Sequence, residues 1–152
     1  MRVCGMDPGT RGAMCVLDSN DPAHIALFDF HLNTIYDAAK WLHDQNVNVI
    51  WLEKIHAFPG MAAKSSFGFG RSYGIAMSIC EIGTKGLLPK SVVPRVWQKH
   101  IGITAKGSMI KKQVAQVAST IYPAANIRGP KGGLIDGRSD ALMIAHYGLS
   151  NI

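Results

Sequence analysis

Acidic residues are scarce in this chain and unevenly spread. Of its 152 residues, 10 are Asp or Glu and 16 are Lys or Arg, which gives a net charge of +6. Residues 85–135 contain nine Lys or Arg and no acid, whereas residues 18–44 contain five Asp and one Lys. This asymmetry predicts a face that meets a polyanion, although a solvated basic surface would show the same pattern. Aromatic and glycine residues within the basic half, such as Trp97 and Gly102, favour nucleic acid.

Long apolar runs are absent as well. No stretch is long enough to span a bilayer. The polar turn around Asp7 and Arg11 interrupts the region in which a signal peptide needs an unbroken apolar segment. We therefore expect no membrane partner and no secretion.

Cysteine is limited to three residues, Cys4, Cys15 and Cys80. An odd number in apolar contexts predicts reduced, buried thiols rather than disulfides. Neither these cysteines nor the six histidines have the spacing of a zinc site. A disulfide framework and a structural zinc site are therefore not expected.

The length of 152 residues favours a single domain spanning residues 1–152. Apolar patterns and turn residues predict a series of strands and helices. Strands are expected over residues 2–6, 12–18, 24–31, 47–52 and 87–93. Helices are expected over residues 34–45, over 75–82 after the glycine-rich segment 57–74, from Pro94, over 109–121 and over 134–148. Asn33 or Thr34 would cap the first of these helices, and Ser108 would cap the helix over 109–121. Short links between the first three strands indicate an antiparallel meander, and the whole order predicts an α/β domain with a mixed sheet.

Four acids stand where a metal site would need them. Asp7 would end the first strand and Glu53 the fourth, so neighbouring strands would bring both to one edge of the sheet. Asp136 and Asp140 are four residues apart, on one face of the last helix. Clustered carboxylates repel one another unless a cation compensates them. Mg²⁺ and Mn²⁺ prefer oxygen ligands, and two such ions ~4 Å apart can clamp a phosphoryl displacement.

Each acid also has a purely structural interpretation. Asp7 before Pro8 and Gly9 suits a turn, and Asp136 suits a helix N-cap. Glu53 is harder to explain in this way, because a lone acid at the end of an apolar strand is costly without a partner. Asp140 begins the buried side of its helix. Taken together, the four favour a metal site.

Three segments carry a family resemblance when taken in order. They are residues 6–10 (MDPGT), residues 52–56 (LEKIH) with the glycine-rich helix behind them, and residues 139–142 (SDAL). The ordered set resembles the RuvC-type Holliday-junction resolvases of the RNase H-like superfamily, particularly the phage-borne branch. The resemblance implies a five-stranded mixed β-sheet flanked by α-helices, and a homodimer that makes paired nicks in a four-way DNA junction. It also implies a cytoplasmic location, in the host cytoplasm if a phage encodes the chain.

The resemblance assigns two Mg²⁺ or Mn²⁺ ions, and no small-molecule cofactor, to the acids Asp7, Glu53, Asp136 and Asp140. The better-known bacterial members space the last two positions three residues apart, and strict alignment would place Gly137 in the third position. Three and four residues both keep side chains on one helix face. Asp136 is therefore carried over across a shift of one residue.

The resemblance also extends to DNA contacts. Lys111 falls where the family has a basic residue near the phosphate, and would offset charge in the transition state. The family's wedging aromatic is displaced, with His56 near its place and Phe58 two residues on. Expected DNA contacts are His56, Phe58, Lys64, Arg71, Arg95, Lys99, Lys106 and Lys112. Arg71 has an alternative role as a partner for an acid across the dimer.

The segment from Phe58 to Gly74 is expected to sense the substrate. The resemblance implies a dimer interface along this helix, with junction contacts at its start. Its glycines allow close backbone approach. A core position is the expectation for Phe67 and Tyr73 taken alone.

Three other functions remain open from the sequence. A nuclease of the same fold that acts on other branched DNA, RNA or RNA–DNA hybrids would show the same acids and basic surface. A nucleotide-binding module would share the Asp-x-Gly-Thr turn but needs a second domain. A silent binding protein has no obvious reason to keep Glu53 and Asp140.

Overall fold

The computed structural model describes residues 1–56 and 59–152. Its centre is a five-stranded mixed sheet with the order β3-β2-β1-β4-β5. The strands are β1 (Arg2–Asp7), β2 (Ala13–Asp18), β3 (Asp21–Phe28), β4 (Val49–Glu53) and β5 (Lys90–Val92). The first three form an antiparallel meander, and β4 and β5 extend the sheet parallel to β1. The predicted α/β class and mixed sheet are confirmed.

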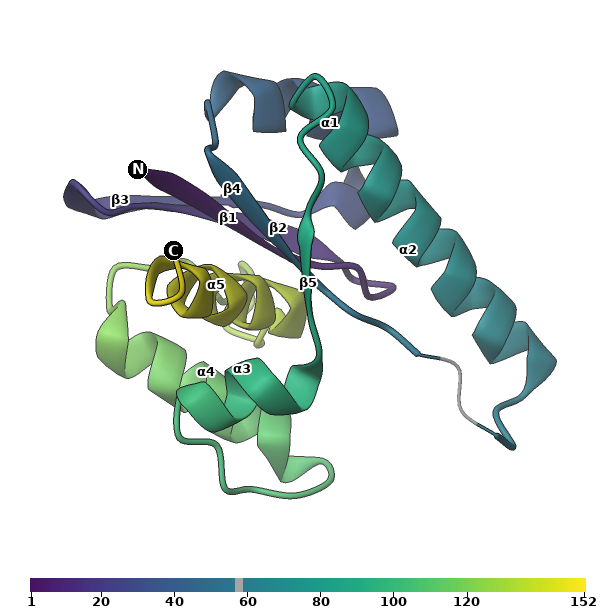
Figure 1. Ribbon diagram of the computed structural model, residues 1–152. Coiled ribbons are helices and arrows are strands. Elements are labelled where there is room, and N and C mark those ends of the chain that lie inside the picture. Colours follow the sequence, from purple (N-terminus) through teal and green to yellow (C-terminus); the bar gives the residue numbers. More distant parts are fainter. Residues whose placement is uncertain (57–58) are drawn as a thin grey trace.

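Helices cover both faces of this sheet (Figure 1). One face carries α1 (Ile35–Asp44) and α2 (Ala63–Gly83), and the other carries α3 (Pro94–His100), α4 (Met109–Ile121) and α5 (Asp136–Leu149). A short 3-10 helix, η1 (Phe30–Leu32), leads from β3 to α1. None of the helices in the described residues has both the length and the hydropathy needed to cross a membrane.

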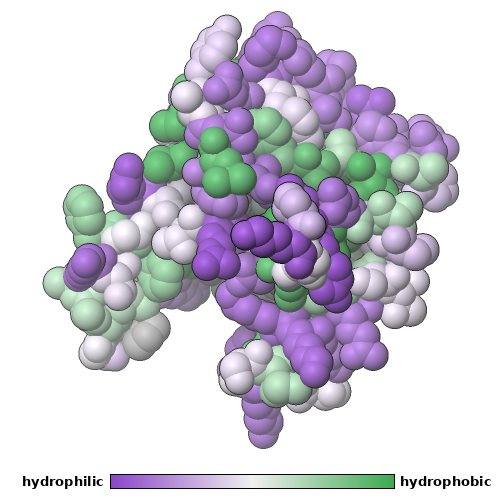
Figure 2. Space-filling model, turned by 180° about the vertical axis from the view of Figure 1, so that it is seen from behind, coloured by the Kyte–Doolittle hydropathy of each residue, from purple (hydrophilic) through white to green (hydrophobic). Residues whose placement is uncertain are grey.

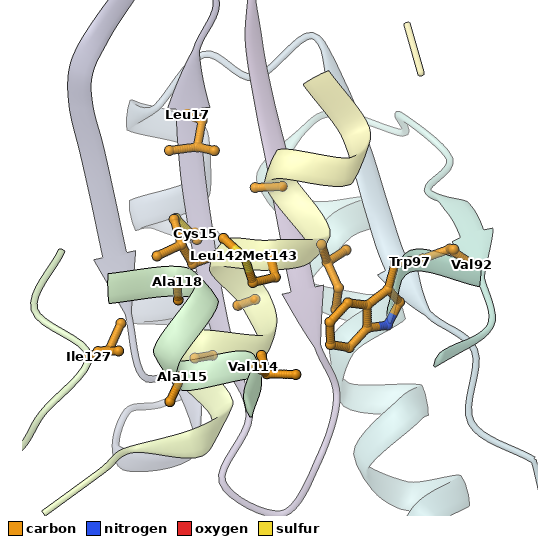
Figure 3. Packing of buried hydrophobic residues seen from close by; sticks show 14 residues of the cluster. Cys15, Leu17, Val92, Trp97, Val114, Ala115, Ala118, Ile127, Leu142 and Met143 are labelled. Carbon is orange, nitrogen blue, oxygen red and sulfur yellow. The ribbon is translucent and has the colours of Figure 1, made fainter. Parts of the chain in front are cut away.

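The pleat of the central strands produces two hydrophobic cores, because successive side chains point to opposite faces. Cys4 and Met6 of β1 are buried against Leu42 of α1, on the α1–α2 face. On the other face, Cys15 of β2 is buried with Leu142 of α5 (Figure 3). All three cysteines are free and buried, as predicted.

Gly5 of β1 allows α5 to lie in backbone contact with the sheet. A Cβ atom at this position would collide with backbone atoms of Ala141 and Ala145. The small residues on both sides therefore set the distance between helix and strand. This close approach brings the N-terminal end of α5 to the carboxyl end of β1.

The glycine-rich segment is helical from Ala63 onward, which corrects the prediction of a helix confined to 75–82. The structure has one helix over Ala63–Gly83. Each glycine in a helix interior costs ~1 kcal/mol relative to alanine, so local propensity argues against this helix. Burial of Ala76, Ile79 and Cys80 in its C-terminal half offsets that cost. Tertiary packing thus extends the helix through a sequence that favours a loop.

The N-terminal half of α2 extends away from the sheet (Figure 1). Phe67 lies there with 77% of its surface exposed, so the expected core position of this side chain is wrong. Tyr73 is partly buried against the core on the α1–α2 face, as expected. On the side opposite to that view, hydrophilic residues predominate and hydrophobic ones form small groups among them (Figure 2).

Element boundaries differ from the predictions at several other points. The fourth and fifth strands, expected over 47–52 and 87–93, span Val49–Glu53 and Lys90–Val92. The predicted strand over 24–31 instead spans Asp21–Phe28, and the chain then turns into η1. Ser108 precedes α4 as predicted, but its backbone is already helical and its side chain makes no capping bond. Thr34 does cap α1, by accepting a hydrogen bond from the backbone N–H of Asp37.

Candidate active site

Asp7 and Glu53 meet at the carboxyl edge of the sheet. β1 and β4 are parallel neighbours, and Met6 pairs with Leu52 in their register. The residue that follows each of these is an acid, so the two carboxylates lie next to each other at the strand ends. This is the edge at which open α/β sheets place their sites.

The first turn of α5 brings Asp136 and Asp140 to the same edge. Gly137 lies against the turn that follows β1, and a Cβ atom there would collide with the backbone O of Arg11 and lie 3.4 Å from Asp7 Oδ2. Gly137 is therefore the point at which the helix touches the turn. A side chain in this position would push α5 away from Asp7.

A single cleft of about 480 Å³ gathers the predicted residues. Its lining includes all four acids and Lys111; the complete set is Asp7, Gly9, Thr10, Arg11, Glu53, Phe69, Lys111, Asp136, Gly137 and Asp140. The ends of β1 and β4, the turn after β1, and the helices α2, α4 and α5 thus converge here. The structure thus brings together the four acids and Lys111 that the sequence singled out.

Three of the acids hold their protons more tightly than usual. Burial, together with repulsion from Asp136, raises the pKa of Asp7 to about 6, although the hydrogen bond from the Gly9 N–H acts to lower it. Burial and the charge of Asp7 raise the pKa of Glu53 to about 7. Burial, Asp7 and Glu53 raise the pKa of Asp140 well above its ordinary value. Carboxylates in this condition favour a nearby cation.

Asp136 differs from the other three because Lys111 is its ion-pair partner. Burial acts to raise the pKa of Asp136, but the hydrogen bond and charge of Lys111 outweigh it, and the pKa is lowered. The hydrogen bond to Asp136 raises the pKa of Lys111 in turn. The Lys111 side chain is 63% exposed, so it reaches the cleft from the solvent side.

The chemistry of this donor set fits a hard divalent cation. All four side chains offer carboxylate oxygens, which Mg²⁺ and Mn²⁺ prefer, and three of them have raised pKa values through burial and mutual repulsion. Within residues 1–56 and 59–152, no three His, Cys, Asp or Glu side chains are close enough to form a compact metal-binding group. The acids therefore line the cleft from several sides and do not enclose a single point.

Trp97 is a site residue that the sequence analysis noted only as an aromatic in the basic half. Its indole Nε1 donates a hydrogen bond of 2.9 Å to Glu53 Oε1, and its side chain is 1% exposed. The bond lowers the pKa of Glu53 against the larger effect of burial. No local sequence signal pairs Trp97 with Glu53, because α3 and β4 meet only in the tertiary structure.

Sequence reasoning also missed Phe69, Arg11 and an ion pair behind the cleft. Phe69 and Arg11 both line the cleft, and the charge of Arg11 helps to lower the pKa of Asp136. Arg138, two residues from each acid of α5, forms an ion pair with Asp29. The sequence signal for Arg11 and Arg138 was that each is a charged residue close to a candidate acid.

The predicted DNA contacts lie on several elements, and none of those in the described residues lines the cleft itself. His56 and Arg95 line a second, mostly apolar cavity of about 570 Å³ that shares Asp7, Glu53 and Phe69 with the first. Arg71 lines a third, of about 500 Å³, between α2 and the start of α1. The remaining exposed lysines lie on α2 (Lys64), α3 (Lys99), the α3–α4 connection (Lys106) and α4 (Lys112). Phe58 lies outside the described residues.

No protein-family model and no curated protein matches the sequence. Solved structures do match the fold. Thermus thermophilus RuvC has a TM-score of 0.61 at 17% identity, over 99% of this chain and 97% of that one. The same protein in complex with a Holliday junction substrate gives 0.61 at 16% identity, over 95% and 90%.

A viral structure matches as well. The fowlpox virus resolvase in complex with Holliday junction DNA has a TM-score of 0.52 at 17% identity, and the match covers 99% of this chain and 98% of that one. In every case the likeness spans almost the full length of both chains. The chain therefore has the same fold as RuvC and the fowlpox virus resolvase.

Proposed function

We propose that this protein is a metal-dependent endonuclease that resolves four-way DNA junctions by paired nicks. The observation that carries the proposal is the gathering of Asp7, Glu53, Asp136 and Asp140 around one cleft at the carboxyl edge of the sheet. The fold supports it, because a matching structure of Thermus thermophilus RuvC is a complex with a Holliday junction substrate. Membership of the phage-borne branch stays a prediction.

The four acids would hold two Mg²⁺ or Mn²⁺ ions, with Asp7 at the centre of the set. Bound ions of this kind lower the pKa of a water nucleophile and stabilise the leaving 3′ oxygen of a phosphodiester. The protein contributes the desolvated oxygen donors and fixes their positions through β1, β4 and α5. Asp136 and Asp140, on adjacent turns of α5, reach the cleft from one helix face.

Other side chains act on the phosphate and on the acids. Lys111 is flexible and largely exposed, so its ammonium group can leave Asp136 and offset charge on a phosphate in the cleft. Trp97 keeps one oxygen of Glu53 oriented through its N–H. Arg11, at the rim of the same cleft, adds a second positive charge. These groups need no rearrangement of the backbone to meet a bound strand.

The basic residues around the cleft would bind the DNA backbone. His56 and Arg95 border it through the second cavity, while Lys112 follows Lys111 on α4. Contacts to phosphates give affinity but carry no direct sequence information. Selectivity for branched DNA would therefore come from the spatial arrangement of these phosphate contacts on the protein surface.

We further propose that α2 forms a homodimer interface. Phe67 and Ile82 on this helix are 77% and 62% exposed. Gly70 and Gly74 are exposed, and a Cβ atom at either would meet nothing within 4 Å in the monomer. Positions 67, 70 and 74 share one helix face, so a second α2 could approach closely there. Two active sites in one dimer would account for paired nicks.

Cleavage and binding of a synthetic four-way junction by Asp7→Asn test the proposed function. We expect wild-type protein to nick two opposing strands in Mg²⁺. The variant should lose cleavage but retain binding, because Asn keeps the shape of the side chain but not its charge. Undiminished cleavage by this variant would sink the metal-site assignment. Three-way junctions, flaps and RNA–DNA hybrids should be cut more slowly, and a preference for any of them would redirect the proposal to that substrate.

A further inference from the structure

Arg138 and Asp29 form an ion pair across 109 residues of sequence. Arg138 Nε lies 2.9 Å from Asp29 Oδ1, and Arg138 Nη2 lies 2.6 Å from Asp29 Oδ2. The remaining nitrogen, Nη1, donates to the backbone O of Asn126 at 2.8 Å. The Asp29 side chain is 6% exposed and that of Arg138 20% exposed, so solvent and salt screen the pair weakly.

On one side, the pair holds the first turn of α5. Arg138 lies between Asp136 and Asp140 in this turn, and its contact to Asn126 also ties down the chain that follows α4. The guanidinium is a planar fork, so two parallel bonds to one carboxylate fix its direction as well as its distance. The rotation of the first turn about the helix axis is thereby restricted.

At its other end, the pair anchors η1, which packs against the turn after Asp7. Asp29 directly precedes η1. Phe30 of η1 lies against Gly12, where a Cβ atom would collide with its ring, and His31 Nδ1 lies 3.1 Å from the backbone O of Gly12. The two halves of the acid site are therefore linked through η1 and Arg138.

Repulsion among the clustered acids acts against the placement of the first turn of α5. Asp7 and Asp140 repel each other, which pushes this turn outward. The contact of Gly5 with Ala141 and Ala145 sets the distance between helix and strand. A directional bond at the start of the helix would oppose the outward movement.

We propose that Arg138 is a positioning residue, whose forked bonds to Asp29 hold Asp136 and Asp140 where they share divalent cations with Asp7. This inference rests on the proposed function, because it assumes that the acids bind metal. It predicts that loss of the pair weakens metal binding while the fold and the DNA-binding surface persist.

The test is a double variant of the full chain, Asp29→Asn with Arg138→Gln. Removing both charges avoids the unpaired buried charge that either single substitution would leave. The dissociation constant for Mn²⁺, measured by electron paramagnetic resonance, should rise about tenfold or more, as is usual when an outer partner of metal ligands is lost. With a four-way junction, kcat should fall, KM should stay the same, and excess Mn²⁺ should restore part of kcat.

Two further variants keep the result interpretable. Arg2→Gln with Asp18→Asn removes another ion pair, of 3.2 Å, at the far end of β1, and should leave Mn²⁺ binding unchanged. Arg138→Lys keeps the charge, and with it the fold, but loses the forked geometry. It should show the same defect in Mn²⁺ binding as the double variant, to a smaller degree.

The outcomes separate the inference from the function on which it rests. Unchanged Mn²⁺ affinity and kcat in a folded double variant, or in Arg138→Lys, would show that the pair is only structural. An equal loss in the Arg2–Asp18 control would show the same. Wild-type protein that binds no Mn²⁺ and cuts no branched DNA would overturn the proposed function and the positioning role together.

Discussion

Trp97 Nε1 lies 2.9 Å from Glu53 Oε1, and this hydrogen bond connects α3 to the acid that ends β4. The indole is 1% exposed, so water cannot replace it as a donor without a rearrangement of the core. Glu53 also lines the cleft. An aromatic core residue is thus also part of the site.

Trp97→Phe should slow cleavage while leaving junction binding intact. Hydrogen bonds to charged groups contribute about 1.5–3 kcal/mol, so a loss of about tenfold or more in kcat is expected. The matched control is Trp51→Phe, because Trp51 Nε1 is buried and makes no hydrogen bond in the described residues. Equal losses in both variants would mean that packing, and not the bond to Glu53, is responsible.

The stability of the metal-free protein should depend on pH through the cleft. Asp7 and Glu53 have folded-state pKa values of about 6 and about 7, and that of Asp140 is also raised. The folded state therefore binds protons more tightly than the unfolded state, whose carboxyl pKa values are near ~4. The contribution of these three groups to the free energy of unfolding is then highest at low pH, and it falls as pH rises from ~4 through ~7.

Asp140→Asn tests this dependence in the presence of a chelator. At pH 8 the variant should melt at a temperature about 3 °C or more above wild type, since it removes repulsion worth ~1 kcal/mol or more. At pH 4 the gain should vanish, because Asp140 is then protonated in wild type. Asp21→Asn, an exposed acid whose bond from Ala23 N an Asn can keep, should change neither value. A lower melting temperature for Asp140→Asn at pH 8 would contradict the repulsion.

Gly74→Glu should convert the proposed dimer into a monomer. A Cβ atom at position 74 meets nothing within 4 Å in the described residues, and Glu favours a helix over Gly, so the fold should persist or gain stability. Light scattering should show the halved mass, and junctions should receive single rather than paired nicks. Gly133→Glu, an equally open glycine away from α2, should remain dimeric. A dimer that survives Gly74→Glu would place the interface elsewhere.

Lys99→Ala and Lys106→Ala should weaken junction binding without a change in sequence preference. Each phosphate contact that is lost should lower the slope of log K against log salt by about one. Lys40→Ala serves as the control, because Lys40 is paired with Asp44 on α1. Fluorescence anisotropy over a salt series measures all three. A wild-type affinity that does not change with salt would exclude the basic half as the DNA-binding face.

Predictions from the sequence worked best where local chemistry sets the structure. The turn after Asp7, the cap at Thr34 and the proline that begins α3 lie where the residue types favour them. They failed where packing overrides propensity, as in the glycine-rich part of α2. Phe67 shows the same limit, because an aromatic side chain in a glycine-rich segment does not reveal that its helix extends beyond the sheet.

The one-residue shift in the acid spacing of α5 has a tertiary explanation. Gly137 occupies the position that strict alignment would assign to an acid, and it touches the turn at Arg11, where no side chain fits. Asp136, one residue earlier, reaches the cleft instead and meets Lys111. The sequence indicated an ambiguity, and the close contact of helix and turn shows why the acid precedes the glycine.

By itself, the sequence indicated which residues would carry the proposed chemistry: scarce acids at strand and helix ends, within a chain otherwise rich in lysine and arginine. These follow from residue type and short-range periodicity, which the sequence contains directly. Only the tertiary structure decided which residues orient those acids. Trp97 reaches Glu53 across 44 residues and Arg138 reaches Asp29 across 109, and such pairings depend on how helices pack on the sheet.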